Sequence, residues 1–244
     1  MKRRSILGTT GAVLTSLVLA SSVLAAGAFQ NGSFENGTWA GSNTYYPLET
    51  GQPSGSAMTG WIVTSGTVDW IDGYWASQDG SRSVDLNGTP TANVPSPVAG
   101  TLSQTFATVP NSTYVVSFYY AGNPDGGPAV KQMTVSATGG ISQIVTFDTT
   151  GKTTSSMGWI AGGYSFVAVG ISTTLSFAAD PANTSNQGIA LDNVSIVETL
   201  ATGAKCKNGG WQSMVDSYGV AFRNQGDCVS YYATGLRNLA NPTD

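Results

Sequence analysis

The stretch from Val68 to Gly88, VDWIDGYWASQDGSRSVDLNG, concentrates aromatic rings and carboxylates. Its first eight residues contain Trp70, Tyr74 and Trp75 interleaved with Asp69 and Asp72. Sugar rings expose C–H faces that stack on flat aromatic side chains, while carboxylates and amides bind the sugar hydroxyl groups. These residue types at this spacing therefore predict a carbohydrate-binding surface.

The two-residue period of a β-strand indicates which rings face the core. Along VDWI, Val68 and Trp70 share one face, so Trp70 is predicted to be a core residue. Tyr74 and Trp75 follow the turn signal Asp72-Gly73 and are predicted to project from a loop. We expect Tyr74, Trp75 and Asp72 to contact a ligand.

The neighbouring segments supply further polar groups. QDGSRSVDLNG turns at its Asp-Gly pair and enters a core strand, so Asp85 and Asn87 are expected to face solvent or a shallow concave face. The loop AGNPDGGPAVK adds Asn123, Asp125 and Lys131 as ligand-binding candidates. An ordinary turn is the alternative for this loop, because turns require the same residue types.

The sequence contains no histidine, which removes the commonest general base and a frequent zinc ligand. A glycosidase would need an acid and a second carboxylate roughly 5 to 9.5 Å apart across a cleft. Asp69 and Asp72 are the nearest candidates, but the sequence does not distinguish an acid from a base. A binding protein is therefore favoured over an enzyme, and no catalytic residue is predicted.

The chain begins with Met1-Lys2-Arg3-Arg4, an apolar stretch and a run of small residues ending at Ala28. This pattern predicts a secretory signal peptide over residues 1–28, and the paired arginines also resemble a twin-arginine export signal. Removal of the leader leaves seven basic against 14 acidic residues, a formal net charge of −7. We expect a secreted protein that binds neither nucleic acid nor anionic membranes and has no membrane insertion.

Residues 29–198 alternate apolar and polar positions and contain no long helical pattern. Turn residues separate a series of predicted strands: STYVVSFYYAG, KQMTVSATG, SQIVTFD, GGYSFVAVG, STTLSFAAD and GIALDNVSIVE. Eight or more strands without an internal repeat predict a single all-β domain, an antiparallel β-sandwich of jelly-roll type.

The composition changes after residue 198. Residues 199–205 are predicted to be a linker, and residues 206–244 form a small polar and aromatic module. Cys206 and Cys228 are expected to pair in an exported chain. Their disulfide would stabilise the module by roughly 3 kcal/mol on the chain-entropy model.

The two ends of the predicted sandwich each carry a carboxylate. NGSFE ends at Glu35, and ALDNVSI contains Asp192. The first and last strands of a jelly roll lie close together, so these carboxylates are expected to meet and, with backbone carbonyls, to bind calcium. Ordinary surface carboxylates are the alternative.

These segments, with GWIVTSGTVDWIDGYWASQDG, GTLSQTFATV, YAGNPDGGPAVKQMTV and GWIAGGYSFVAV, resemble the plant cell-wall domain of unknown function 642 and its bacterial choice-of-anchor C branch. The resemblance implies a galactose-binding-like jelly roll related to carbohydrate-binding modules. It also implies a structural calcium site at Glu35 and Asp192, and an association with cell-wall polysaccharide. Plant members usually carry two such domains, whereas this chain carries one.

The sequence thus predicts a secreted, non-catalytic protein that binds cell-wall or extracellular polysaccharide. Two alternatives remain open at this stage. One is a structural or adhesive surface protein that binds other proteins, and the other is a glycoside hydrolase.

Overall fold

The computed structural model describes residues 26–39, 43–51, 57–95, 99–110, 112–199, 206–216 and 220–233. Nearly all of the predicted signal peptide, most of the linker and the last residues of the C-terminal module lie outside these ranges. Within the described ranges, no helix is both long enough and apolar enough to cross a bilayer.

Eleven strands occur in the described residues. In chain order they are β1 (Tyr45–Glu49), β2 (Ile62–Ser65), β3 (Thr67–Asp72), β4 (Arg82–Asp85), β5 (Thr101–Ala107), β6 (Thr113–Gly122), β7 (Val130–Ala137), β8 (Gln143–Asp148), β9 (Ile160–Val167), β10 (Ser172–Ala179) and β11 (Ile189–Thr199). The six strands expected from the later half of the sandwich sequence all form, as β6 to β11.

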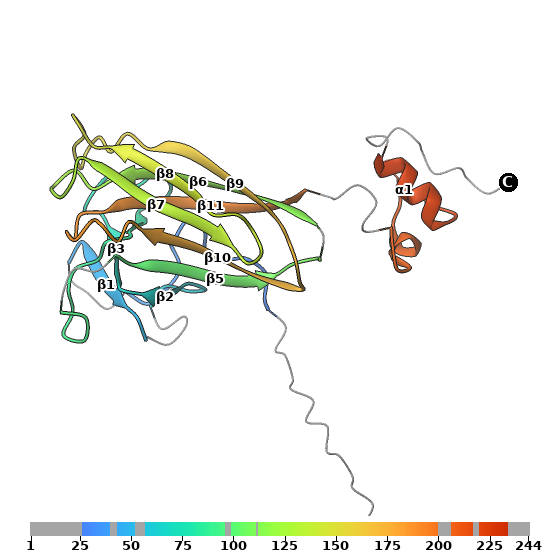
Figure 1. Ribbon diagram of the computed structural model, residues 1–244, viewed down its shortest axis with the longest axis horizontal. Coiled ribbons are helices and arrows are strands. Elements are labelled where there is room, and N and C mark those ends of the chain that lie inside the picture. The colour runs from blue at the N-terminus through green and yellow to red at the C-terminus, as the bar shows by residue number, and fades with distance from the viewer. Residues whose placement is uncertain are drawn as a thin grey trace, which may run out of the picture.

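The strands build two antiparallel sheets that face each other (Figure 1). The six-stranded sheet has the order β1-β3-β4-β11-β6-β9, and the five-stranded sheet has the order β2-β5-β10-β7-β8. All strand pairs in both sheets are antiparallel. The predicted antiparallel β-sandwich is confirmed.

Alternation along the strands places apolar side chains between the sheets. Val68 and Trp70 of β3 and Val84 of β4 are fully buried, and the indole Nε1 of Trp70 donates a hydrogen bond to the carbonyl of Phe34 (2.9 Å). Burial of each such side chain contributes about 1.5–3 kcal/mol to folding. The prediction that Trp70 is a core residue is confirmed.

The outer face of β3 and β4 is also buried, although its residues are polar. Five side chains on this face are at most 6% exposed: Thr67, Asp69, Ser83, Asp85 and Asn87. Loops from distant parts of the chain cover them, because Thr89 bonds Asp69 and the carbonyl of Asn183 accepts from Asn87. This covered polar face holds the candidate site.

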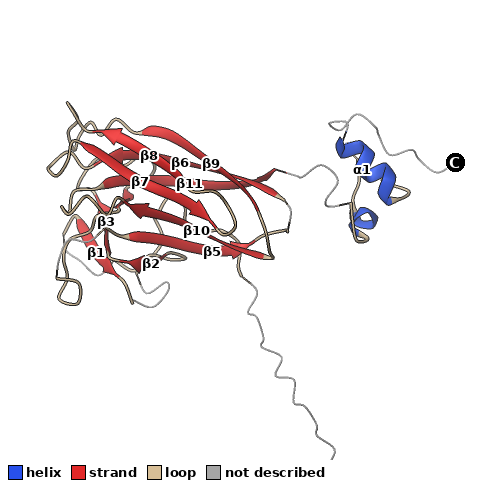
Figure 2. Cartoon of the chain, in the orientation of Figure 1, coloured by secondary structure: helices blue, strands red, loops and turns tan. Residues whose placement is uncertain are grey.

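Among the described residues, the helices lie in the C-terminal module (Figure 2). It contains the 3₁₀ turn η1 (Gly210–Ser213) and the helix α1 (Gln225–Ala233). Cys206 and Cys228 form the predicted disulfide, and they pack with Phe222 and Tyr231 in a small separate core.

Removing this disulfide should unfold the module and leave the sandwich intact. Two of the four buried residues in the small core are the bonded cysteines, and loop closure stabilises a module of this size by about 3 kcal/mol. A double Cys206→Ser, Cys228→Ser variant should lose protease resistance in residues 206–233 while β-sheet circular dichroism stays unchanged. Unchanged protease resistance in the variant would contradict this role.

Candidate functional site

A polar pocket of about 80 Å³ opens on the outer face of the six-stranded sheet. It is lined by Tyr45, Asp69, Ile71, Tyr74, Asp85, Thr89, Asn123, Asn186 and Gln187. Pockets that enclose a whole small molecule measure roughly 300–1,000 Å³. This pocket therefore admits one polar edge or one substituent of a ligand, and the rest of the ligand would lie across its rim.

Strand register places the two pocket carboxylates side by side. Asp69 of β3 is paired directly with Asp85 of β4, and Tyr45 of β1 is paired with Ile71 of β3. All four residues lie on the strand face opposite Val84 and the core. Three neighbouring strands thus supply the floor of the pocket.

Asp85 joins three segments of the chain beneath the pocket. Its Oδ1 accepts the backbone N–H groups of Asn87 and Gly188, both at 3.0 Å, and its Oδ2 accepts Nδ2 of Asn123 at 2.9 Å. A Cβ at Gly188 would lie 2.6 Å from Asp85 Oδ1, so a larger residue would push this N–H group away from the carboxylate. Burial raises the pKa of Asp85 to about 8.

Asp69 is also buried but makes fewer hydrogen bonds. Its two oxygens accept the backbone N–H (2.9 Å) and the hydroxyl (2.8 Å) of Thr89. Burial raises the pKa of Asp69 to about 6, against the opposing effect of these two bonds. Each carboxylate oxygen has two acceptor positions, so half of the capacity of Asp69 is left for a ligand.

These raised pKa values predict that the folded chain loses stability as the pH rises. The unfolded chain releases these protons near pH 4, while folded Asp69 and Asp85 hold theirs up to pKa values of about 6 and 8. Stability is therefore greatest below the unfolded pKa and falls as the pH rises through the folded values. Urea denaturation at pH 5 and pH 8 should show a lower midpoint at pH 8, with a smaller difference in Asp85→Asn. Equal midpoints in the wild type would contradict the burial of these carboxyls.

Two tyrosines form the rim of the pocket. The Tyr74 side chain is 37% exposed, and its hydroxyl donates to Oδ2 of Asp125 at 2.6 Å, which raises the pKa of Tyr74 to about 12. The Tyr45 ring meets the Tyr74 ring edge-on, with 6.1 Å between the ring centroids. The exposed Tyr74 ring is available for stacking, and Asp125 holds it in place.

The structure corrects the expected exposure of Trp75. This side chain is only 4% exposed, and its Nε1 donates to Oγ of Ser83 at 2.7 Å. The loop after β3 returns over the outer face, so Trp75 covers the sheet while its neighbour Tyr74 faces outward. Asp72 does not line the pocket, and instead its Oδ2 pairs with Nε of Arg82 at 3.3 Å.

The structure also corrects the expectation that Lys131 contacts a ligand. Lys131 is fully buried, and its ammonium donates to the carbonyls of Gly126 and Gln187. It joins the loop after β6 to the loop before β11, and burial lowers its pKa. Of the six predicted ligand-binding residues, Tyr74 and Asn123 line the pocket, and Asp125 and Lys131 support it through these hydrogen bonds.

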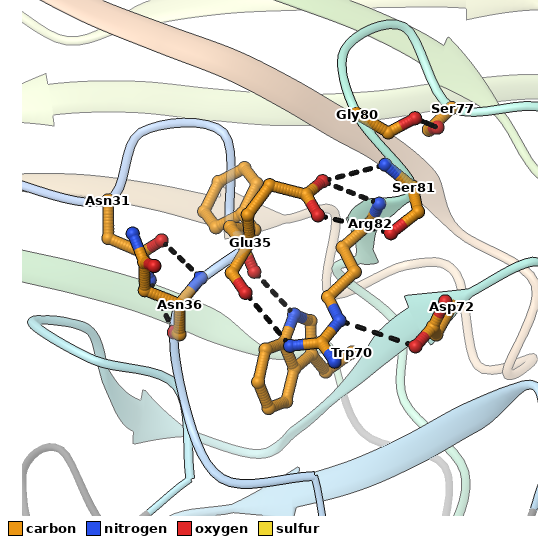
Figure 3. A network of polar contacts seen from close by, with 10 residues as sticks. Asn31, Glu35, Asn36, Trp70, Asp72, Ser77, Gly80, Ser81 and Arg82 are labelled. Atoms are coloured by element: carbon orange, nitrogen blue, oxygen red, sulfur yellow. Dashed lines mark hydrogen bonds and ion pairs between the residues drawn. The ribbon is translucent and has the colours of Figure 1, made fainter.

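Glu35 and Asp192 hold one turn, residues 78–82, from two sides. Oε1 of Glu35 accepts the backbone N–H groups of Ser81 (2.9 Å) and Arg82 (2.7 Å), as Figure 3 shows. Oδ2 of Asp192 accepts those of Gln78 (2.8 Å) and Asp79 (3.0 Å). The expectation that they lie on adjacent first and last strands is wrong, because Glu35 lies in an irregular segment that precedes β1.

Glu35 and Asp192 supply carboxylate oxygens, the kind of ligand that calcium prefers, while the turn between them presents backbone N–H groups. Asp192 is fully buried, burial raises its pKa to about 7, and no cationic side chain pairs with it in the described part of the chain. A buried carboxylate without a counter-charge is costly, and a bound cation would offset this cost. The described residues hold no group of three acidic, histidine or cysteine side chains, so Glu35 and Asp192 would need backbone carbonyls to complete a calcium site.

Residues 27–197 match the family model described as Protein of unknown function (DUF642). The chain belongs to the DUF642 family. The match does not distinguish the bacterial choice-of-anchor C branch, which stays a prediction.

This DUF642 chain is 32% identical to Halomucin of Haloquadratum walsbyi over 144 residues. The match covers 59% of the chain but only 1% of Halomucin. Similar solved structures include TmCBM61 in complex with β-1,4-galactotriose (16% identity, TM-score 0.38, 71% of this chain and 99% of that one). Another is CBM35 from Paenibacillus barcinonensis (16% identity, TM-score 0.38, 64% and 100%).

The sequence did not identify several residues of the pocket. Tyr45, Asn186 and Gln187 lie far from the aromatic stretch in sequence and reach the pocket only through strand pairing and loop closure. The sequence did indicate the position of Asp85, because strand alternation placed it on the face of β4 that points away from Val84 and the core.

Proposed function

We propose that this DUF642 chain is an exported, non-catalytic protein that binds polysaccharide or glycan at the pocket beside Tyr74. The observation that carries this proposal is the exposed Tyr74 ring at the rim of a pocket whose floor consists of carboxylates and amides. A sugar ring against Tyr74 could direct its hydroxyl groups into the pocket, where Asp69 and Gln187 offer acceptors.

The size of the pocket favours recognition of one sugar edge within a longer glycan. About 80 Å³ accommodates a substituent but not a ring, and the loops around the pocket leave the rest of the glycan on the protein surface. This mode suits binding along an insoluble polysaccharide, where neighbouring sugar residues stay connected to the one that is recognised.

The same geometry favours binding over hydrolysis. Asp69 and Asp85 are directly opposite each other in the sheet, where side chains start about 4.5–5.5 Å apart at Cβ. Both carboxyls are engaged by neighbouring loops, and the pocket does not admit a sugar ring between them. A glycosidase instead places its two carboxyls on either side of the bond that it cleaves.

We further propose that Glu35 and Asp192 bind a structural calcium ion, which would neutralise buried carboxylate charge at the 78–82 turn. Adding a chelator should lower the melting temperature of the wild type by several degrees, since unbinding removes ligand stabilisation of the folded state. Asp192→Ala should be less stable and insensitive to chelator. A wild-type transition that does not move with chelator would contradict the calcium site.

The experiment that tests glycan binding is a screen of the full exported chain on a glycan array and on insoluble polysaccharides, with calcium and with chelator. Selective retention on one class of glycan supports the proposal and identifies the ligand class. No retention under either condition would overturn it and would favour an adhesive protein that binds other proteins.

A further inference from the structure

The pocket contains carboxyl groups that no protein cation neutralises. Neither Asp69 nor Asp85 forms an ion pair with any side chain in the described part of the chain. Asp125 adds a third carboxylate at the rim, where it accepts the Tyr74 hydroxyl. The groups that face a ligand here are therefore acidic or neutral.

The buried cation Lys131 of β7 does not bond the pocket carboxyls. The ammonium of Lys131 donates to two backbone carbonyls, those of Gly126 and Gln187. Although its charge acts on Asp85 at a distance, it makes no hydrogen bond to either pocket carboxyl. The Asp69 carboxylate thus keeps a preference for a cation supplied from outside.

The unused acceptor positions lie on Asp69. Thr89 fills one position on each of its oxygens, whereas three N–H groups nearly saturate Asp85. An ammonium group donates three hydrogen bonds and is small enough for a pocket of about 80 Å³. Charge-assisted hydrogen bonds of this kind are roughly twice as strong as neutral ones.

We propose that the pocket binds the protonated amino group of a hexosamine, so that the preferred glycan contains free 2-amino sugars. This inference rests on the proposed function, since it assigns a sugar class to the same pocket. Acidic sugars would meet the like charge of Asp69 and Asp125, and an N-acetyl group would remove the positive charge and add bulk. A metal ion is less suited, because no three acidic, histidine or cysteine side chains of the described residues are grouped closely enough to hold one.

The test is calorimetric titration of the full exported chain near pH 7 with matched tetrasaccharides. The β-1,4-linked series of glucose, glucosamine and N-acetylglucosamine differ only at C2, and galactose and galactosamine oligomers provide a second pair. We expect at least one amino series to bind at least tenfold more tightly than its neutral and N-acetylated counterparts. Raising sodium chloride from 50 to 500 mM should reduce this preference severalfold, because ion pairs are screened.

Asp69→Asn should abolish the tenfold preference, so that amino and neutral oligosaccharides bind this variant with similar affinity. Asp72→Asn is the matched control, since Asp72 pairs with Arg82 outside the pocket, and it should keep the preference. If Asp69→Asn does not fold, the salt dependence of the wild type decides, and a preference that salt leaves unchanged overturns the inference.

Other outcomes separate this inference from the proposed function. Three results would overturn the amine assignment and keep glycan binding. One is equal binding of amino and neutral oligosaccharides. Another is binding of neutral oligosaccharides that requires added calcium and is still observed in Asp192→Ala. The third is binding of a neutral or acidic glycan with no binding of either amino series. If no glycan binds, both proposals are overturned.

Discussion

Replacing Trp75 by alanine should lower the free energy of unfolding of the sandwich by about 3–5 kcal/mol, the usual cost of removing a large buried aromatic side chain. Trp75 is 4% exposed, and its indole N–H is bonded to the hydroxyl of fully buried Ser83. The variant would leave a cavity over the outer face of β3 and β4 and an unpaired hydroxyl beneath it. Equilibrium denaturation in guanidinium chloride measures the loss.

A graded series identifies the cause of that loss. Trp75→Phe keeps one aromatic ring but removes the hydrogen bond to Ser83 and part of the packing, so it should cost less than Trp75→Ala, about 1–3 kcal/mol. Tyr74→Ala, at the adjacent exposed position, should cost less than about 1 kcal/mol. If the free energy of unfolding of Trp75→Ala lies within about 1 kcal/mol of the wild-type value, the buried placement of Trp75 is wrong. Trp75 would then again be a candidate for ligand contact.

Replacing Tyr74 by alanine should weaken glycan binding about 10- to 100-fold and leave the melting temperature nearly unchanged. The ring is the exposed aromatic surface at the pocket, and a central aromatic contact commonly accounts for about 2 kcal/mol or more of binding free energy. Calorimetric titration with the best glycan from the screen measures the effect. Wild-type affinity in this variant would exclude stacking on Tyr74.

Tyr74→Phe separates stacking from hydrogen bonding. Phenylalanine keeps the ring but cannot donate to Asp125, so affinity should fall by only about twofold to fivefold if stacking dominates. A loss as large as that of Tyr74→Ala would instead indicate that the hydroxyl, held by Asp125, makes the decisive contact.

Strand alternation and turn residues together were sufficient to predict the antiparallel β-sandwich. The two-residue period placed Trp70 in the core and Asp85 on the opposite face, and both placements agree with the structure. Alternation assigns a face but does not tell whether loops cover that face. The burial of Asp85 depends on Asn123 and Gly188, which are distant in sequence, so its raised pKa could not be predicted.

The loop after β3 shows where sequence reasoning fails. Tyr74 and Trp75 are adjacent and of similar chemistry, and a loop has no periodicity to separate them. Their opposite orientations go with different partners, since the Tyr74 hydroxyl bonds Asp125 and the Trp75 indole N–H bonds Ser83. Only the three-dimensional structure distinguishes the exposed ring from the buried one.

The proximity of Glu35 and Asp192, which lie near the two ends of the sandwich sequence, was predicted in part. Glu35 and Asp192 do act on one structural feature, the turn of residues 78–82, as their expected proximity implied. They do so through backbone N–H groups of a third segment rather than through adjacent strands. The sequence could not reveal this segment, because its contribution comes from main-chain atoms whose positions depend on the fold.

The central claim is that a glycan binds across the pocket beside Tyr74, and the most direct test is a nuclear magnetic resonance titration of residues 29–244 with the glycan selected by the screen. We predict that amide shifts change most at Tyr45, Tyr74, Thr89, Asn123 and Gln187, and that Tyr74→Ala removes these changes. Shifts confined to other surfaces, such as the apolar groove of Phe29, Phe106 and Tyr114, would contradict the account.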